Sequence, residues 1–302
     1  MVGLPLVVAL ALVAPFLVYP VFLMKALCFA LFACAFNLML GFGGLLSFGH
    51  AAFFGGAAYV TAHAAKVWGM DPLLAILLGG FASAVLGGIF GAIAIRRQGI
   101  YFAMITLALS QVVYFGALQA PFTGGEDGIQ GVPRGTVFGL IDLSSSMTMY
   151  YFVLAIVAAG FLAIQRIVHS PFGQTLKAIR DNEPRAISLG YKAEQFKLIA
   201  FVLSAGLAGI AGSTKALVFQ LASLTDVNWH MSGEVVLMTL IGGVGTLFGP
   251  VVGAFIVVGI QTFFAEMGSW VTIIQGVIFV ACVLLFRRGV VGVFNDLIRR
   301  KG

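Results

Sequence analysis

The stretch PLLAILLGGFASAVLGGIFGAIAI, residues 72–95, decides the fold class because it is apolar throughout and carries no charged residue. A helix needs about 20 such residues to cross the hydrocarbon core of a bilayer. Comparable apolar runs recur near residues 4–23, 26–41, 46–65, 100–119, 149–168, 198–219 and 270–286. The sequence therefore predicts an all-α, polytopic integral membrane protein, in which residues 1–302 form a single transmembrane domain.

The composition of the chain excludes an ordinary soluble fold. Hydrophobic residues make up 61% of the 302 residues and charged residues only 9%, whereas a soluble domain carries about 25% charged residues. A soluble fold of this length leaves roughly a quarter of its unfolded surface exposed, so it could not hide so much apolar surface. The net charge of +6 comes from basic residues at the ends of apolar runs, which indicates membrane topology and not nucleic-acid binding.

Basic residues divide unevenly between the two sides of the predicted bundle. Of the 17 Lys and Arg residues, 13 fall within residues 96–99, 166–197 and 287–302. The positive-inside rule places these segments, and both termini, in the cytoplasm. The long loop near residues 120–148 then lies outside, and the segment near residues 169–197 is the largest cytoplasmic one.

Two glycine-rich stretches interrupt the apolar runs. Residues 233–261 are apolar for longer than one span and contain GGVGTLFGP at residues 242–250, which predicts two short helices meeting at a break. GFGGLLSFGH at residues 41–50 is a loose echo of it, and about ten helical elements result. Paired interruptions in two halves point to a central pathway. The candidates for the breaks and the pathway are Gly43, Gly44, Ser47, Gly49, His50, Gly242, Gly243, Gly245, Gly249 and Pro250.

The cytoplasmic segment is expected to hold two short helices. Pro171 would begin the first, which runs to about Asp181, and Pro184 would begin the second, which stops at Gly190. Apolar residues recur on these helices without a bilayer-length run to join. They fit burial in the groove of a partner protein, or the segment is an ordinary basic loop at the membrane surface.

Sequence signatures of common chemistry are missing from the chain. It has no GxxxxGK[ST] phosphate loop for ATP and no HExxH motif, and its histidines and cysteines are scattered. We therefore expect no catalytic residue, no cofactor and no metal site, and the sequence favours transport over catalysis. A stand-alone secondary transporter is the rival, and an intramembrane enzyme would need a ligand cluster that the sequence lacks. A secondary transporter would need coupling residues at membrane depth, for which the nearest candidates are Asn37, Lys215 and Glu234.

Four blocks of sequence resemble the signatures of one transporter family. Residues 41–58, with LSFGHAAF at 46–53, resemble the G-x-L-S-x-G-H-A-A-F-F signature of branched-chain amino-acid permeases. TGGEDGI at residues 123–129 resembles their external TGG-x-x-G segment and indicates the M-type permease. Residues 170–190 resemble their cytoplasmic coupling motif, and residues 242–250 their second glycine-rich break. The chain is thus similar, over nearly its whole length, to LivM-like permease subunits of branched-chain amino-acid ABC importers.

This resemblance implies a fold similar to that of vitamin B12-type importer permeases and a location in the bacterial inner membrane. It implies a homologous second permease (LivH-like), two cytoplasmic ATPase subunits and an extracytoplasmic substrate-binding protein as partners, in a lipid bilayer and without nucleic acid. The implied substrates are leucine, isoleucine and valine, and urea or another small amide or amino acid is the alternative. The implied ATPase-coupling residues, in contact or in support of it, are Phe172, Gly173, Ala178, Arg180, Glu183, Ala186 and Gly190.

Overall fold

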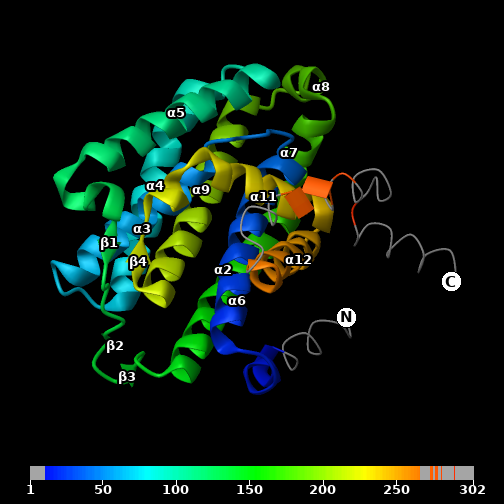
Figure 1. The fold of residues 1–302 in the computed structure, drawn as a ribbon. Coiled ribbons are helices and arrows are strands. Elements are labelled where there is room, and N and C mark those ends of the chain that lie inside the picture. The colour runs from blue at the N-terminus through cyan, green and yellow to red at the C-terminus, as the bar shows by residue number, and fades with distance from the viewer. Residues whose placement is uncertain (1–10, 266–272, 275, 278–279, 281–288, 290–302) are drawn as a thin grey trace, which may run out of the picture.

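The computed structural model describes residues 11–265, 273–274, 276–277, 280 and 289, and within them the fold is almost entirely helical (Figure 1). The long helices are α2 (Pro20–Asn37), α3 (His50–Lys66), α4 (Pro72–Ala94), α5 (Ile100–Gln119), α6 (Ser146–His169), α9 (Ala193–Phe219), α11 (Trp229–Gly242) and α12 (Gly249–Phe263). The shorter elements are the π-helix η1 (Leu38–Phe42), the 3-10 turns η2 (Pro121–Thr123) and η3 (Gly125–Asp127), the helices α7 (Pro171–Asp181), α8 (Glu183–Ser188) and α10 (Leu224–Val227), and the strands β1 (Ile129–Gln130), β2 (Thr136–Val137), β3 (Ile141–Asp142) and β4 (Leu221–Ala222).

The predicted all-α, polytopic membrane fold is confirmed. Helical stretches long and apolar enough to cross a bilayer are Pro20–Phe42, Pro72–Ala94, Ile100–Gln119, Ser146–His169 and Ala193–Phe219. They correspond to five of the predicted apolar runs. The run predicted near residues 270–286 lies mostly outside the described residues, and the run near 4–23 does so in part.

The helices α2 and α9 form the centre of the bundle. α2 packs against α6, α9, α11 and α12, and α9 packs against α2, α3 and α4. Small residues permit these close contacts, as they do in many membrane bundles. At Gly212 of α9, a Cβ atom would collide with the carbonyl oxygen of Phe54 on α3, so these two backbones touch.

The boundary between the first two apolar runs lies earlier than predicted. The prediction left Lys25 between the runs, but α2 begins at Pro20 and carries Lys25 in its second turn. Proline suits the first turn of a helix because it lacks the backbone N–H that would have no partner there. Lys25 therefore belongs to a helix and not to a loop between two helices.

The loops gather at opposite ends of the bundle as the predicted topology requires. At one end, β1 pairs antiparallel with β4, joining residues 120–148 to the segment after α9. At the same end, β2 and β3 form a hairpin before α6. The short helices α7 and α8 lie at the other end of the bundle (Figure 1). We call these the external and the cytoplasmic end, following the predicted orientation.

Candidate functional site

The first glycine-rich break opens at the cytoplasmic end of α2. After the π turn of η1 the chain is non-helical from Gly43 to Gly49, and α3 begins at His50. Gly44 has φ +70°, which favours glycine, and a Cβ atom there would lie 2.6 Å from Cγ of Arg180. The hydroxyl of Ser47 accepts a hydrogen bond from the Gly49 amide at 3.1 Å and so closes the break. The predicted break is confirmed, and the non-helical residues make up most of the predicted stretch 41–50.

The second break turns the chain back on itself. α11 ends at Gly242, and Gly243 and Gly245 follow with φ values of +120° and +77°. α12 then runs antiparallel to α11, because Gly249 lies against Gly242 and Gly253 lies against Met238. The Gly249 amide donates to the Thr246 hydroxyl at 3.0 Å, which caps the new helix. Two short helices meeting at a break, with Pro250 in the first turn of the second, are therefore confirmed.

Asn37 joins the two breaks. Its Nδ2 donates to the carbonyl oxygen of Thr246 at 2.8 Å, and its Oδ1 accepts from the Gly245 amide at 3.0 Å. The side chain is buried at the end of α2. Segments more than 200 residues apart in the chain thus meet at one side chain. Both the nitrogen and the oxygen of the Asn37 side chain are hydrogen-bonded to backbone atoms. These bonds explain why a polar residue is buried here, and no ion-coupling role is needed to explain it.

The last residue predicted at the first break, His50, lies inside the bundle. Its Nε2 is 2.9 Å from the Ser204 hydroxyl, and its ring packs edge-on against Phe36, Phe53 and Phe201. The side chain is fully buried. Within this chain, His50 therefore fastens α3 to α9 and does not line the hollow described below.

The two predicted short helices form at the cytoplasmic end with nearly the predicted bounds. α7 starts at Pro171, where the Ser170 hydroxyl accepts from the Gly173 amide at 3.3 Å. α8 starts at Glu183, where Oδ1 of Asn182 accepts from the Arg185 amide at 3.1 Å. These are the N-cap bonds that serine and asparagine commonly make. Gly190, with φ +89°, follows the end of α8.

The inner faces of α7 and α8 are buried by the chain itself, which corrects the expectation that a partner groove buries them. Ile179 and Ala186 pack with Ala193 and Phe196 at the start of α9. Phe172 stacks on Phe196 with ring centroids 5.5 Å apart. Gly173 lies against the last carbonyl groups of α6. Phe172, Gly173 and Ala186 therefore support the segment from within.

The outward face carries a different set of apolar side chains. Ile187, Leu189 and Tyr191 are 56%, 71% and 45% exposed. Of the predicted coupling residues, Ala178, Arg180 and Gly190 are exposed as well. The sequence places Ile187 and Leu189 among the apolar residues of the second short helix, but neither these two nor Tyr191 were predicted as coupling residues. Helical periodicity gives no signal for Leu189 and Tyr191, because α8 ends at Ser188 and both residues lie beyond it.

Arg180 connects α7 to the first break. Its guanidinium donates to the Gly41 carbonyl oxygen and forms an ion pair with Asp181 at 2.8 Å. The Lys177 ammonium group lies 5.3 Å from the ring centroid of Phe42 in η1. Displacement of α7 would therefore act directly on the end of α2.

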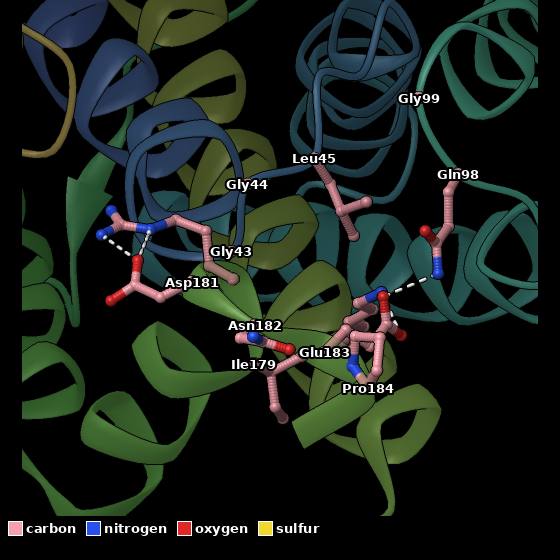
Figure 2. Close-up of a pocket in the computed structure, with 12 residues that line it drawn as sticks. Gly43, Gly44, Leu45, Gln98, Gly99, Ile179, Asp181, Asn182, Glu183 and Pro184 are labelled. Atoms are coloured by element: carbon pink, nitrogen blue, oxygen red, sulfur yellow. Dashed lines mark hydrogen bonds and ion pairs between the residues drawn. The ribbon is translucent and has the colours of Figure 1, made fainter. Parts of the chain in front are cut away.

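A hollow of about 420 Å³ lies where the break and the short helices meet (Figure 2). Glu183 projects into it beside Gln98, which lies on the loop between α4 and α5. Neither Gln98 nor its neighbour Lys197 was predicted as a site residue. The lining residues are Gly43, Gly44, Leu45, Gln98, Gly99, Ile179, Arg180, Asp181, Asn182, Glu183, Pro184 and Lys197.

Two other candidates for ion-coupling residues, Lys215 and Glu234, lie toward the external end. Lys215 forms an ion pair with Asp226 of α10, and Asp226 also accepts a hydrogen bond from Ser223 at 3.3 Å. Glu234 lies in the second turn of α11. Of the two candidates, Lys215 is thus paired with a carboxylate of the same chain.

Comparison with known proteins places the chain among membrane permeases. Residues 20–286 match the family described as branched-chain amino acid transport system / permease component. The high-affinity branched-chain amino acid permease LivM of Salmonella typhimurium strain LT2 is 28% identical over 223 residues, covering 66% of this chain and 52% of that protein. LivM of Escherichia coli K12 is 27% identical over the same shares.

A second group of relatives carries a different description. The autoinducer 2 import system permease LsrC of Salmonella typhi is 26% identical over 190 residues, covering 59% of this chain and 51% of that protein. The chain therefore spans about half the length of the curated relatives it matches. No solved structure matches the chain.

Proposed function

The chain belongs to the family of permease components of branched-chain amino acid transport systems, and on this premise we propose that it is the membrane permease subunit of an ATP-driven importer for leucine, isoleucine and valine. It would provide part of the translocation pathway in the bacterial inner membrane, with both termini in the cytoplasm. ATP hydrolysis would belong to separate subunits, since the sequence has no phosphate loop.

One observation carries this proposal: the cytoplasmic segment has an exposed apolar face and an inner face fastened to a helix break. Ile187, Leu189 and Tyr191 project outward from the segment. Exposed apolar side chains on and just after a short helix suit a groove in another protein. On the inner side, Arg180 binds the Gly41 carbonyl oxygen at the end of α2. A partner that moves α7 and α8 would thereby move the end of a membrane-spanning helix.

Membership of this family supports a set of partner subunits. Two ATPase subunits would bind the cytoplasmic segments of this chain and of a homologous second permease. Closure of the ATPase pair on ATP would displace the segments and tilt the helices around a pathway between the two permeases. A substrate-binding protein would deliver the amino acid at the external end. These assignments rest on the family and on the geometry of the cytoplasmic end.

The branched-chain amino acids are the preferred substrate class because the LivM relatives match over a larger share of this chain than LsrC does. An amino acid of this class is a zwitterion with an apolar side chain. Small and apolar pathway residues would let it pass without strong binding, so that affinity would reside in the external binding protein.

Reconstitution of the complete complex tests the proposal. The chain would be co-purified with its second permease and ATPases and placed in proteoliposomes, with the binding protein added outside. We expect uptake of labelled leucine, isoleucine and valine that requires ATP on the side of the membrane to which the ATPase subunits are bound. Uptake of urea or autoinducer 2 in preference to these amino acids would overturn the substrate assignment. Ion-driven uptake by the chain alone would overturn the ATP-driven mechanism.

The orientation has its own test. Reporter fusions placed after the last residue and within residues 120–148 should report opposite sides of the membrane, with the C-terminus in the cytoplasm. The same side for both fusions would contradict the proposed topology.

A further inference from the structure

Glu183, the first residue of α8, is held by two other parts of the bundle. Its Oε1 lies 2.6 Å from Nζ of Lys197 on α9. Its Oε2 accepts a hydrogen bond from Nε2 of Gln98 at 2.6 Å, and Gln98 lies between α4 and α5. Both carboxylate oxygens are therefore used inside this chain, on the side of α8 that faces the hollow (Figure 2).

The ion pair is shielded from solvent although it borders the hollow. The Lys197 side chain is 5% exposed and the Glu183 side chain 18%. A shielded pair has a strong preference for staying together, because separation leaves each charge without a partner in a poorly solvated place. Glu183 and Lys197 should therefore move as one unit when α8 is displaced.

The position of Lys197 on α9 connects the ion pair to the centre of the bundle. Lys197 is in the second turn of a helix that packs against α2, α3 and α4. Ile179 and Ala186 also pack against the start of α9, and Arg180 reaches Gly41 in η1. The ion pair adds a shielded charged contact with α9 to this packing.

We propose that Glu183 and Lys197 form the connection that passes displacement of α8 to α9, with Gln98 fixing the carboxylate. Glu183 is then a positioning residue inside the permease, and the ATPase contact falls to the exposed apolar residues Ile187, Leu189 and Tyr191. This inference rests on the proposed function, because it assumes that an ATPase moves the segment. The proposal also assigns contact with the ATPase and transmission of movement to different residues, whereas the sequence assigned coupling to residues 170–190 as a whole.

Charge exchange in the reconstituted complex tests the connection. Glu183→Lys and Lys197→Glu each place like charges together, and the double variant restores an opposite pair. We expect each single variant to retain the ATPases on purification but to transport at least about tenfold less leucine per ATP hydrolysed. The double variant should recover to within about threefold of the original complex. A double variant no better than the singles would overturn the pairing.

A gentler variant covers the case in which the reversed charges prevent assembly. Glu183→Gln keeps the size of the side chain and a hydrogen-bond acceptor for Gln98, but removes the charge that holds Lys197. It should assemble and show reduced uptake per ATP. Unchanged uptake per ATP in this variant would overturn the inference, whatever the charge-reversed variants do.

The external pair of α9 supplies the matched control. Exchange of Lys215 and Asp226, as Lys215→Asp with Asp226→Lys, alters a shielded ion pair on the same helix far from the segment. We expect it to change the amount of complex recovered and not the uptake per ATP. Failure of ATP-driven uptake in the unaltered complex would count against the proposed function itself. Normal uptake there, together with normal coupling in Glu183→Gln, would count against the connection alone.

Discussion

The two ends of α9 use the same kind of ion pair in different surroundings. Lys197 is the fifth residue from one end of the helix and Lys215 the fifth from the other, so about 27 Å of helix separates them. At the external end, Lys215 and its partner Asp226 are only 11 residues apart in the chain. At the cytoplasmic end, Lys197 pairs with a residue of the short α8 beside an open hollow.

The surroundings of the two pairs differ in how many other bonds reinforce them. Around the external pair, β1 pairs with β4, Arg134 donates to the Val218 carbonyl oxygen at 2.8 Å, and the Val132 amide donates to Gln220 at 3.1 Å. Around the cytoplasmic pair, α8 is fastened mainly by the small cluster behind Ala186 and by Glu183. Regions with fewer buried contacts open at lower free-energy cost. On this comparison we expect the external end to be the more stable of the two and the cytoplasmic end to be the more easily displaced.

The largest effect is expected from removing one partner at the external end. Asp226→Ala leaves the ammonium group of Lys215 without its counter-charge in a shielded place, which costs about 3–5 kcal/mol of stability. The thermal unfolding midpoint of the purified protein in detergent should fall sharply. Replacing both partners, as Lys215→Met with Asp226→Leu, should recover most of the loss. A midpoint unchanged in Asp226→Ala would mean that this end is not held by the pair.

A smaller loss is expected when α9 is pushed away from α3. Gly212→Ala adds a Cβ atom that collides with the Phe54 carbonyl oxygen, and overpacking of this kind costs about 1–3 kcal/mol. The unfolding midpoint should fall, though by less than in Asp226→Ala. Gly233→Ala on α11, where a Cβ atom meets open space, is the matched control and should be neutral. Equal midpoints for both variants would show that α9 is not tightly packed between its two ends.

A substitution at the cytoplasmic end should weaken binding of the ATPase subunits without lowering the stability of the chain. Leu189→Asp places a charge on the exposed apolar face, and loss of a central contact typically weakens an interface by more than about 1 kcal/mol. We expect roughly tenfold weaker retention of the ATPase subunits in a titration with purified components. Ser188→Asp, on an exposed neighbour, is the matched control and should bind nearly normally. Undiminished ATPase binding in Leu189→Asp would place the docking surface elsewhere.

The smallest effect is expected at the external hairpin, at Asp142. Hydrogen bonds from the Ser144 hydroxyl and backbone amide lower the pKa of this carboxyl below its usual range. A lowered pKa in the folded state means that the contribution to stability is present above about pH 3.9 and is lost as the pH falls through the folded-state value. Ser144→Ala should raise the Asp142 pKa toward about 3.9, as read from a carboxyl NMR titration. An unchanged pKa in Ser144→Ala would show that the Ser144 hydroxyl does not lower the pKa of Asp142.

Local features of this fold follow from the sequence, because their signals are local. Proline at residues 171 and 184 and glycine at 190 mark the short cytoplasmic helices, and glycine clusters mark both helix breaks. Proline and glycine act on the backbone where they stand, through a missing donor or an accessible positive φ. The structure reproduces these elements within one or two residues. Their roles in coupling and in the pathway stay predictions.

Long-range relations did not follow from the sequence. Asn37 joins segments more than 200 residues apart, and no sequence pattern marks such a contact. Lys197 and Glu183 are near in the chain, but their pairing depends on how α8 lies against α9. The burial of Gly173 and Ala186 depends on where α9 begins relative to α8. Lys25 was read as a loop residue because a charge in an apolar run usually marks its end. The structure instead begins α2 at Pro20, five residues before Lys25.

The π turn at Leu38–Phe42 has a consequence for how this chain can gain or lose residues. Such a turn takes up one residue more than the α-helical turn it replaces, within a single widened loop of backbone. Loss of one codon here would tighten the turn and leave α2 in register with its neighbours. Loss of one codon earlier in α2 would rotate part of the helix by about 100° and misplace its buried face. Homologues that lack the π turn should therefore be one residue shorter at this point, and their arginine equivalent to Arg180 should have to find another carbonyl group.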